Sequence, residues 1–483
     1  MGQVMAKQKR TESLRGRALK GSAYLALRNG ISLLIGLVGS LFVTRLIGPD
    51  NYGLYMAAFG IFSYLSNAVS PSVVAYLVRE QSPDFLRHFH LAFWWLLGLG
   101  VIAAGVASGV VLVAAQLSGQ IGDFQWIAVL QFVLLPLALI SAVPRALLER
   151  DLNYRSLATI QLCSQITFYL AAAPLAWRGA GAWALVTGFW LSQIVQAVGY
   201  YTAARYRPRW YWNCHAWKQM LSYSFSHSLS GWLYNLRDLA PSVILFPLAG
   251  ERAVGYYALA DRFMRMIGFL YTAFGGVAFS AFARLQEDKE RFIRAIQESI
   301  QYLIVFLGVV LSVFVACIGL VASWILGSKW NVIIIQQLCI LMASRILLSS
   351  VFGVQTQALY VVGQNWLKVK VNAIFAVVLM AASGLLVGTA PVDYAPLMFV
   401  LADHIAHIPT YWYDMYGVRK HIGRVDYRII LLWLVAAQIA LFAPLIGYWL
   451  YLVAIGLLLH PRSLRELGEI ARTLKRHSRM ENG

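Results

Sequence analysis

The chain has 483 residues, of which 59% are hydrophobic and only 13% are charged, whereas an ordinary soluble domain is about 45–50% apolar and about 25% charged. This composition excludes a soluble multidomain enzyme and a disordered chain. The long continuous apolar runs also exclude a membrane β-barrel, whose strands alternate apolar and polar residues. The formal net charge of +19 would suggest nucleic-acid binding in a soluble protein, but its distribution along this chain has another explanation, and no nucleic-acid partner is expected. The sequence therefore predicts an all-α polytopic membrane protein.

Apolar runs bounded by charged residues, Pro and Gly predict about 14 transmembrane helices of about 20 residues each. The first run follows a basic N-terminus and is too long for the core of a signal peptide, so it is expected to stay uncleaved. The final apolar stretch surrounds Pro444 and Gly447 and fits either one long helix or two short ones. The predicted helices cover residues 22–46, 53–78, 91–116, 126–144, 156–176, 183–203, 221–248, 254–282, 299–326, 332–360, 369–389, 394–416, 429–443 and 445–459.

The basic residues distinguish the two sides of the membrane. Most of the 40 Lys and Arg residues fall in the two termini and in alternate loops on one side, while the other side carries Arg45, Arg178, Arg252 and Lys329. Because Lys and Arg gather on the cytoplasmic side, both termini are expected in the cytoplasm. A single final helix would place the basic tail outside, so the charges favour two helices. All loops are short, and any chemistry is expected within the membrane.

A short internal repeat predicts two halves. The segment LIGPDNYGLY at 46–55 returns as LAGERAVGYY at 248–257, with both glycines and the last tyrosine matched. Each copy ends the first helix of a six-helix set and opens the second, which is typical of parallel repeats related by a pseudo-two-fold axis along the membrane normal. The predicted parts are a basic N-terminus 1–21, N lobe 22–203, linker 204–220, C lobe 221–416, loop 417–428, helix pair 429–459 and basic tail 460–483.

Five arginines lie within predicted spans, where each costs about 2.5–3.5 kcal/mol near the bilayer centre. We expect such residues to face a solvated cavity between the lobes, because small and polar residues recur beside them at helical spacing. The midspan acids Asp238 and Asp403 leave positive charge in excess, and guanidinium groups bind phosphate oxygens well. The candidate substrate-binding residues, for a phosphate or pyrophosphate, are Arg28, Arg237, Arg262, Arg265 and Arg345.

Each arginine also has a structural alternative. Arg28 is close enough to its helix start to reach the cytoplasmic surface, and Arg345 could have a structural role. Arg265 could mainly pair with Asp261 one turn earlier. Arg237 or Asp238 could neutralise a group on another helix.

Three ionisable residues are candidates for coupling transport to an ion gradient or the membrane potential. Asp403 and His407 lie one turn apart near mid-membrane, where a carboxylate and an imidazole can carry protons, and Asp238 is the other midspan acid. The sequence contains no phosphate-binding loop, dinucleotide fingerprint or nucleophile elbow. We therefore expect no enzyme activity, no cofactor and no metal, and the four cysteines suggest no disulfide.

The segments GSAYLALRNGISLLIGLVGSLFVTRLIGPDNYGLY at 21–55, PRALLERDLNYRSLA at 144–158 and VGYYALADRFMRM at 254–266 resemble Wzx-type polysaccharide flippases. These form the polysaccharide transport branch of the MOP (multidrug, oligosaccharide-lipid, polysaccharide) exporter superfamily. The resemblance implies two six-helix lobes with alternating access. It also implies transfer of an undecaprenyl-pyrophosphate-linked oligosaccharide across a bacterial inner membrane, with a polysaccharide polymerase or co-polymerase as a further partner.

The resemblance also suggests roles for individual helices. In the related lipid II flippases, arginines on the first and eighth helices receive the pyrophosphate, and Arg28, Arg262 and Arg265 lie on the corresponding helices here. Helices 13 and 14 of those proteins form a groove for the lipid tail, although residues 429–459 are short for two spans.

Two other functions compete with the flippase. A MATE-like multidrug exporter would need an acidic or neutral cavity for cationic drugs, whereas this chain places five arginines in its spans. A membrane polymerase or ligase of surface polysaccharide synthesis would need a large periplasmic loop, and the predicted loops are short. The residues do not specify whether the glycan is an O antigen, a capsule or an exopolysaccharide.

Overall fold

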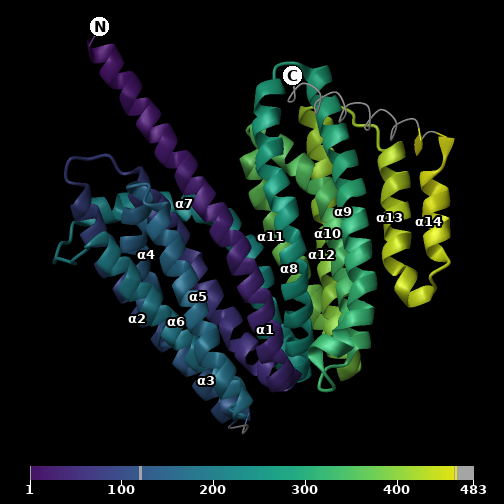
Figure 1. The fold of residues 1–483 in the computed structure, drawn as a ribbon, viewed down its shortest axis with the longest axis horizontal. Helices are drawn as coiled ribbons and strands as arrows, with labels where there is room; N and C mark the ends of the chain where they lie inside the picture. The colour runs from purple at the N-terminus through teal and green to yellow at the C-terminus, as the bar shows by residue number, and fades with distance from the viewer. Residues whose placement is uncertain (1, 119–121, 462, 465–483) are drawn as a thin grey trace. The chain divides into compact units, whose positions relative to one another are not determined.

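The computed structural model describes residues 2–118, 122–461 and 463–464, with side chains from Gly30 onward except at scattered positions. These residues form helices joined by short loops, and no strand occurs among them (Figure 1). The helices are α1 (Gly2–Arg79), α2 (Phe85–Ser118), α3 (Asp123–Phe132), α4 (Leu135–Arg150), α5 (Tyr154–Trp177), α6 (Ala182–Ala204), α7 (Cys214–Ala240), α8 (Phe246–Leu285), α9 (Lys289–Leu326), α10 (Val332–Val361), α11 (Asn365–Thr389), α12 (Ala395–His421), α13 (Arg428–Ile446) and α14 (Leu450–Leu458), with a π-helical turn η1 (Pro241–Leu245) and a 3-10 turn η2 (Val392–Tyr394).

The predicted helices and the observed ones agree in order but differ at several boundaries. The first two predicted spans form the continuous α1, which changes direction at Gly48. The predicted helix 126–144 is divided into α3 and α4, because Pro136 lacks the backbone N–H that a continuous helix would need. The last apolar stretch forms two helices, α13 and α14, separated at Gly447, whose φ of 156° suits glycine. The prediction of a final helix pair is thereby confirmed.

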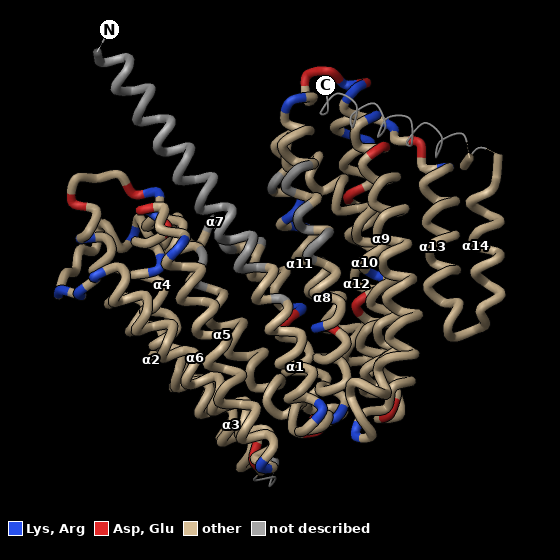
Figure 2. Tube along the Cα trace, in the orientation of Figure 1, with Lys and Arg blue, Asp and Glu red and all other residues tan. Residues whose placement is uncertain are grey.

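Charged residues lie mainly at the helix ends and in the loops, with long uncharged stretches between them (Figure 2). Among the described residues, nine helical stretches are long and apolar enough to cross a membrane. Apart from the short α14, three helices fall outside this group, namely α7, α8 and α12. The same three helices hold most of the candidate site residues. Burying polar groups in a membrane is costly, and such residues mark functional paths in membrane proteins.

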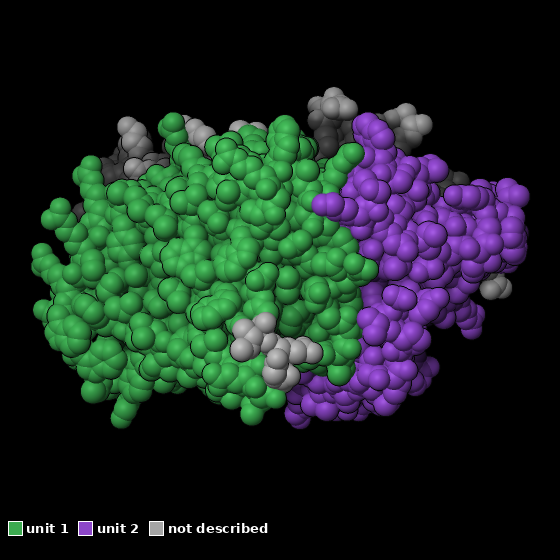
Figure 3. All heavy atoms as spheres, turned by 90° about the horizontal axis from the view of Figure 1, so that it is seen from below, with its two compact units in different colours: residues 1–255 green, residues 256–483 purple. Residues whose placement is uncertain are grey.

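By internal contacts the chain divides into two units, residues 1–255 and 256–483, which Figure 3 shows in different colours. In unit 1, α5 packs along α6 and α1, and a core of apolar side chains joins α1, α2 and α4. In unit 2, α9 packs against α10 and α13, while α12 packs against α10 and α11. The division falls within α8, and the lobe and linker boundaries predicted from the sequence stay predictions.

The two copies of the repeated segment have the same backbone conformation. Gly48 has φ 79° and ψ 176°, and Gly250 has φ 79° and ψ −177°. A positive φ of this size favours glycine, which has no Cβ to clash with the preceding carbonyl. The matched glycines therefore have the same positive-φ conformation at a kink in α1 and in α8.

Within unit 1 the two repeated segments pack backbone against backbone. A Cβ atom on Gly53 would overlap with the carbonyl oxygen of Glu251, and a Cβ atom on Gly255 would overlap with that of Pro49. Arg252 adds a two-pronged ion pair, because its Nε and Nη2 donate to the two carboxylate oxygens of Asp50 over 2.8 and 3.0 Å. Both partners are exposed, so this pair adds at most about 1 kcal/mol to stability. The close approach of Gly53 and Gly255 to the opposite backbone therefore requires glycine at both positions.

Replacing Gly255 by alanine is expected to destabilise the chain by about 1–3 kcal/mol, because the new methyl group must displace the Pro49 backbone. The measurement is the thermal unfolding midpoint of the detergent-purified chain. Gly98→Ala in α2 is the matched control, since a Cβ atom there meets nothing within 4 Å. Equal midpoints for the two variants would show that the segments do not depend on this contact.

Candidate functional site

The middle of α8 carries two neighbouring arginines. Arg262 and Arg265 lie 12 and 15 residues beyond the bend at Gly250, which corresponds to about 18 and 22 Å along the helix. Each is therefore far from the bend, in the part of α8 that the sequence predicts to span the membrane. Arg262 is half-buried, whereas the Arg265 side chain is 59% exposed.

Asp261 holds Arg265 in place from one turn earlier on the same helix. The Nε of Arg265 donates a short hydrogen bond to Oδ2 of Asp261, whose side chain is only 13% exposed. The pairing predicted as an alternative for Arg265 is therefore present. It leaves much of the guanidinium group accessible, so pairing with Asp261 and binding of an anion are compatible roles for Arg265.

A buried ion pair joins α10 to α12 in unit 2. The Nε atom of Arg345 lies 3.0 Å from Oδ2 of Asp403, and the two side chains are only 9% and 5% exposed. A pair this deeply buried is neutralised internally, because either charge without its partner would be very costly in an apolar interior. The structure therefore favours a positioning role for Arg345, the alternative that the sequence left open.

His407 lies beside the same carboxylate. Its Nδ1 is 2.7 Å from the backbone carbonyl oxygen of Asp403 and 3.4 Å from the carboxylate Oδ1. Because a carbonyl oxygen only accepts hydrogen bonds, this geometry places a proton on Nδ1. Gain or loss of a proton by the ring would then occur at Nε2. The ring also contacts Phe375 of α11 edge to face, with the ring centroids 4.6 Å apart.

A second buried ion pair was not predicted from the sequence. Lys368 of α11 places its Nζ 3.1 and 3.3 Å from the two carboxylate oxygens of Asp414, and the Thr356 hydroxyl donates to the same carboxylate over 3.0 Å. Lys368 lies just outside the predicted helix 369–389. The detectable signal was Asp414, which continues the polar face of Asp403, His407 and Thr410 along α12.

The remaining predicted site residues are in the N-terminal half of the chain. Arg237 and Asp238 lie near the end of α7 in unit 1, directly before the π-helical turn that begins at Pro241. Single π-helical turns are rare and often occur at functional sites. Arg237 is half-buried, Asp238 is exposed, and both have interaction partners. The side chain of Arg28 lies outside the described residues.

Unit 2 thus brings together two of the predicted groups. Arg262 and Arg265 lie side by side on α8, and Asp403 is in contact with both Arg345 and His407. In the part of the chain that the structure describes, no three His, Cys, Asp or Glu side chains are close enough to hold a metal ion. The chemistry available in unit 2 is anion binding by the exposed guanidinium group of Arg265, with the half-buried Arg262 beside it, and proton exchange at a buried imidazole.

The sequence of residues 42–335 matches the family model described as "Polysaccharide biosynthesis protein". The chain belongs to this family. Its resemblance to polysaccharide flippases is confirmed by two curated relatives. It is 25% identical over 303 residues to the succinoglycan biosynthesis transport protein ExoT of Rhizobium meliloti (strain 1021), covering 61% of this chain and 60% of ExoT. It is 23% identical over 347 residues to the lipopolysaccharide biosynthesis protein WzxC of Escherichia coli (strain K12), covering 68% of this chain and 67% of WzxC.

Two solved transporter structures have the same fold as this chain. The lipid II flippase MurJ in an inward closed conformation aligns with a TM-score of 0.67 and 12% identity, covering 89% of this chain and 95% of MurJ. An inward-facing multidrug resistance MATE family transporter of the MOP superfamily aligns with a TM-score of 0.60 and 17% identity, covering 82% of this chain and 98% of the transporter. The protein is therefore an all-α polytopic membrane protein that shares the fold of these two transporters, as the sequence predicted.

Proposed function

We propose that this chain is a flippase that moves an undecaprenyl-pyrophosphate-linked oligosaccharide across the bacterial inner membrane by alternating access, with both termini in the cytoplasm. Membership of a polysaccharide biosynthesis family supports this function. The names of the relatives ExoT and WzxC, and the fold shared with the lipid II flippase MurJ, agree with it.

The observation that carries the proposal is the exposed guanidinium group of Arg265 beside Arg262 on α8. Such a group is costly in lipid, so its exposed surface is expected to face water or an anionic ligand. Two adjacent guanidinium groups offer several N–H donors for the oxygens of a pyrophosphate. Arg28 and Arg237 are proposed as further ligands, whereas Arg345 acts by holding the Asp403 carboxylate.

Coupling is assigned to the cluster on α12. Arg345 pairs with the Asp403 carboxylate, and His407 beside it would exchange a proton at Nε2. Tyr411, also on α12, places its ring 5.7 Å from the His407 ring, centroid to centroid. Asp238 in unit 1 is the remaining coupling candidate. The proposed function is tested by transfer of the lipid-linked oligosaccharide between the leaflets of proteoliposomes that contain the purified chain.

A further inference from the structure

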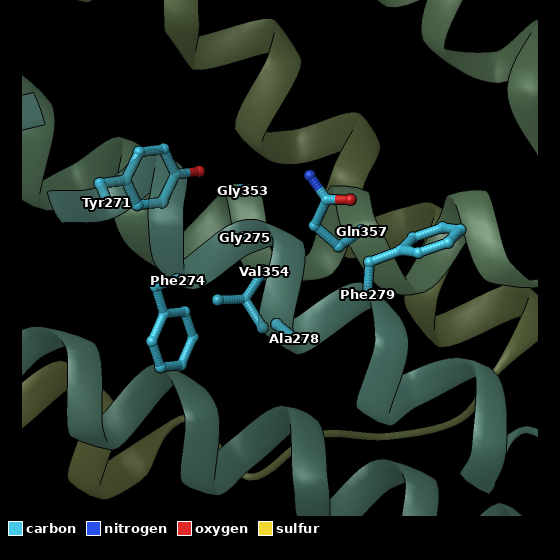
Figure 4. A pocket seen from close by; sticks show the side chains of 8 residues that line it. All are labelled: Tyr271, Phe274, Gly275, Ala278, Phe279, Gly353, Val354 and Gln357. Atoms are coloured by element: carbon cyan, nitrogen blue, oxygen red, sulfur yellow. The ribbon is translucent and has the colours of Figure 1, made fainter. Parts of the chain in front are cut away.

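Unit 2 contains a cavity of about 340 Å³ between α8 and α10. This volume is at the lower end of the range of small-molecule sites, about 300–1,000 Å³. Helix α8 contributes three aromatic side chains and a glycine to its wall: Tyr271, Phe274, Phe279 and Gly275 (Figure 4). Helix α10 contributes Gly353 and the side-chain amide of Gln357.

Two glycines lie in the wall of this cavity, and at Gly353 the close contact with Tyr271 requires glycine. A Cβ atom on Gly353 would overlap with the hydroxyl group of Tyr271, so only glycine lets the Tyr271 ring lie across α10. A Cβ atom on Gly275 would be 3.7 Å from Nε2 of Gln357 and would occupy space in front of that amide. The Tyr271 hydroxyl group is anchored by donating to the backbone oxygen of Ser349 over 3.4 Å.

The lining combines aromatic surfaces with an amide. Figure 4 shows the Tyr271 hydroxyl and the Gln357 amide directed toward one another across the two glycines, with Phe274 and Phe279 at opposite edges. Among the described residues that line the cavity, none is Lys, Arg, Asp or Glu. A charged guest would therefore lack a partner in this cavity, and burying it there would be costly.

This chemistry suits a neutral sugar ring. The C–H faces of a sugar stack on aromatic rings, and its hydroxyl groups both donate and accept hydrogen bonds, as the glutamine amide does. A fully apolar ligand such as an acyl chain would leave the Gln357 amide without a partner, which costs free energy. Tyr271 and Phe279 remain accessible at the cavity edge, and Phe279 is 42% exposed.

The cavity and the two arginines Arg262 and Arg265 lie along the same helix, α8. Tyr271 is six residues beyond Arg265, or about 9 Å along the helix, and Phe279 is fourteen residues beyond it. Fourteen residues are close to four full turns, so Arg265 and Phe279 lie on the same face of α8. A pyrophosphate at Arg265 would thus have the Phe279 edge of the cavity on its own helix face, about 21 Å away, and the Tyr271 edge about 9 Å along the helix and about 120° around it.

We propose that this cavity is a subsite for one neutral sugar ring of the lipid-linked oligosaccharide, close to its pyrophosphate. This inference rests on the proposed flippase function. It goes further by assigning the pyrophosphate and the sugar of the substrate to different groups of residues. Arg262 and Arg265 bind the pyrophosphate, while Tyr271, Phe279 and Gln357 distinguish a lipid that carries a glycan from one that does not.

The test compares two probes on the purified full-length chain: undecaprenyl pyrophosphate without sugars, and the same lipid carrying an oligosaccharide. Equilibrium binding is measured for the wild type, for Gln357→Leu and for Phe279→Ala. Phe306→Ala on α9 is the matched control, because Phe306 is a comparably exposed aromatic residue of unit 2 at 51% and is outside the cavity lining. Gln357→Leu keeps the side-chain size and removes the amide.

Each cavity variant is expected to weaken binding of the glycan-bearing lipid about tenfold and to leave binding of the bare lipid unchanged. Unchanged binding of both lipids would overturn the subsite. An equal loss for both would also overturn it, because the cavity would then hold the lipid tail or support the fold. If the wild type binds neither lipid, the proposed function fails, and the subsite fails with it.

Discussion

Replacing both Arg262 and Arg265 by alanine is expected to abolish export while the chain remains inserted in the membrane. Hydrogen bonds to a charged group contribute about 1.5–3 kcal/mol each, so losing two of them lowers the affinity for the pyrophosphate by at least about 100-fold. The measurement is surface polysaccharide in cells whose own flippase gene is deleted and replaced by the variant. The amount of variant chain in the membrane fraction is determined in parallel.

Arg291→Ala is the matched control for this double variant. Arg291 is also a highly exposed arginine paired with a nearby aspartate, Asp288, but it lies in the first turn of α9, outside the predicted spans. It is expected to support normal export. A variant with lysine at both positions 262 and 265 should keep part of the activity, because lysine retains the positive charge but lacks the paired N–H donors of the planar guanidinium group. Normal surface polysaccharide from the double alanine variant would remove both arginines from the binding site.

Arg345→Met is expected to destabilise the chain by about 3–5 kcal/mol, because it leaves the Asp403 carboxylate buried without its cation. Combining it with Asp403→Asn should restore most of the lost stability, since the buried charge is then removed as well. The measurement is thermal unfolding of the purified chain for the two single variants and the double variant. Arg145→Met is the control: its ion pair with Glu149 is much more exposed and should contribute less than about 1 kcal/mol.

The double variant also separates stability from coupling. If Asp403 and His407 couple transport to protons, the Arg345→Met/Asp403→Asn chain folds but its transport rate no longer changes with pH. His407→Gln, which removes the titrating ring, is expected to flatten the same pH profile. A double variant that is as unstable as Arg345→Met would contradict the ion-pair account, and an unchanged pH profile in both folded variants would contradict the coupling role.

Much of the fold could be predicted because the controlling signals are local. Matched glycines at 48 and 250 mark the two bends, and the basic C-terminal tail indicates an even number of spans, so two final helices. The division between α3 and α4 was missed because the apolar run continues through Val133 and Leu134, and only Pro136 interrupts its backbone hydrogen bonding. Hydropathy detects apolar length better than it detects a break within an apolar run.

The site was less predictable because its contacts join distant parts of the sequence. Arg345 and Asp403 were each recognised as intramembrane charges, but helical periodicity does not say which face of α10 meets α12. Lys368 lies just outside the predicted helix 369–389, so its contact with Asp414 was not predicted either. The residues of the α8–α10 cavity were missed for another reason: phenylalanine and tyrosine inside an apolar run resemble core or interfacial residues, and only the packed helices show that Gly353 and Gly275 leave space beside them.

Leaflet transfer in proteoliposomes measures the proposed function most directly. Undecaprenyl pyrophosphate carrying a labelled oligosaccharide is added to the outer leaflet, and its protection from an external glycan-modifying enzyme is followed over time. Transport of a cationic dye is measured in the same vesicles, as the substrate expected of a multidrug exporter. The account predicts that vesicles with the chain protect the labelled lipid, that empty vesicles do not, and that the Arg262→Ala/Arg265→Ala chain behaves like empty vesicles. Transport of the cationic dye with no protection of the lipid would contradict it.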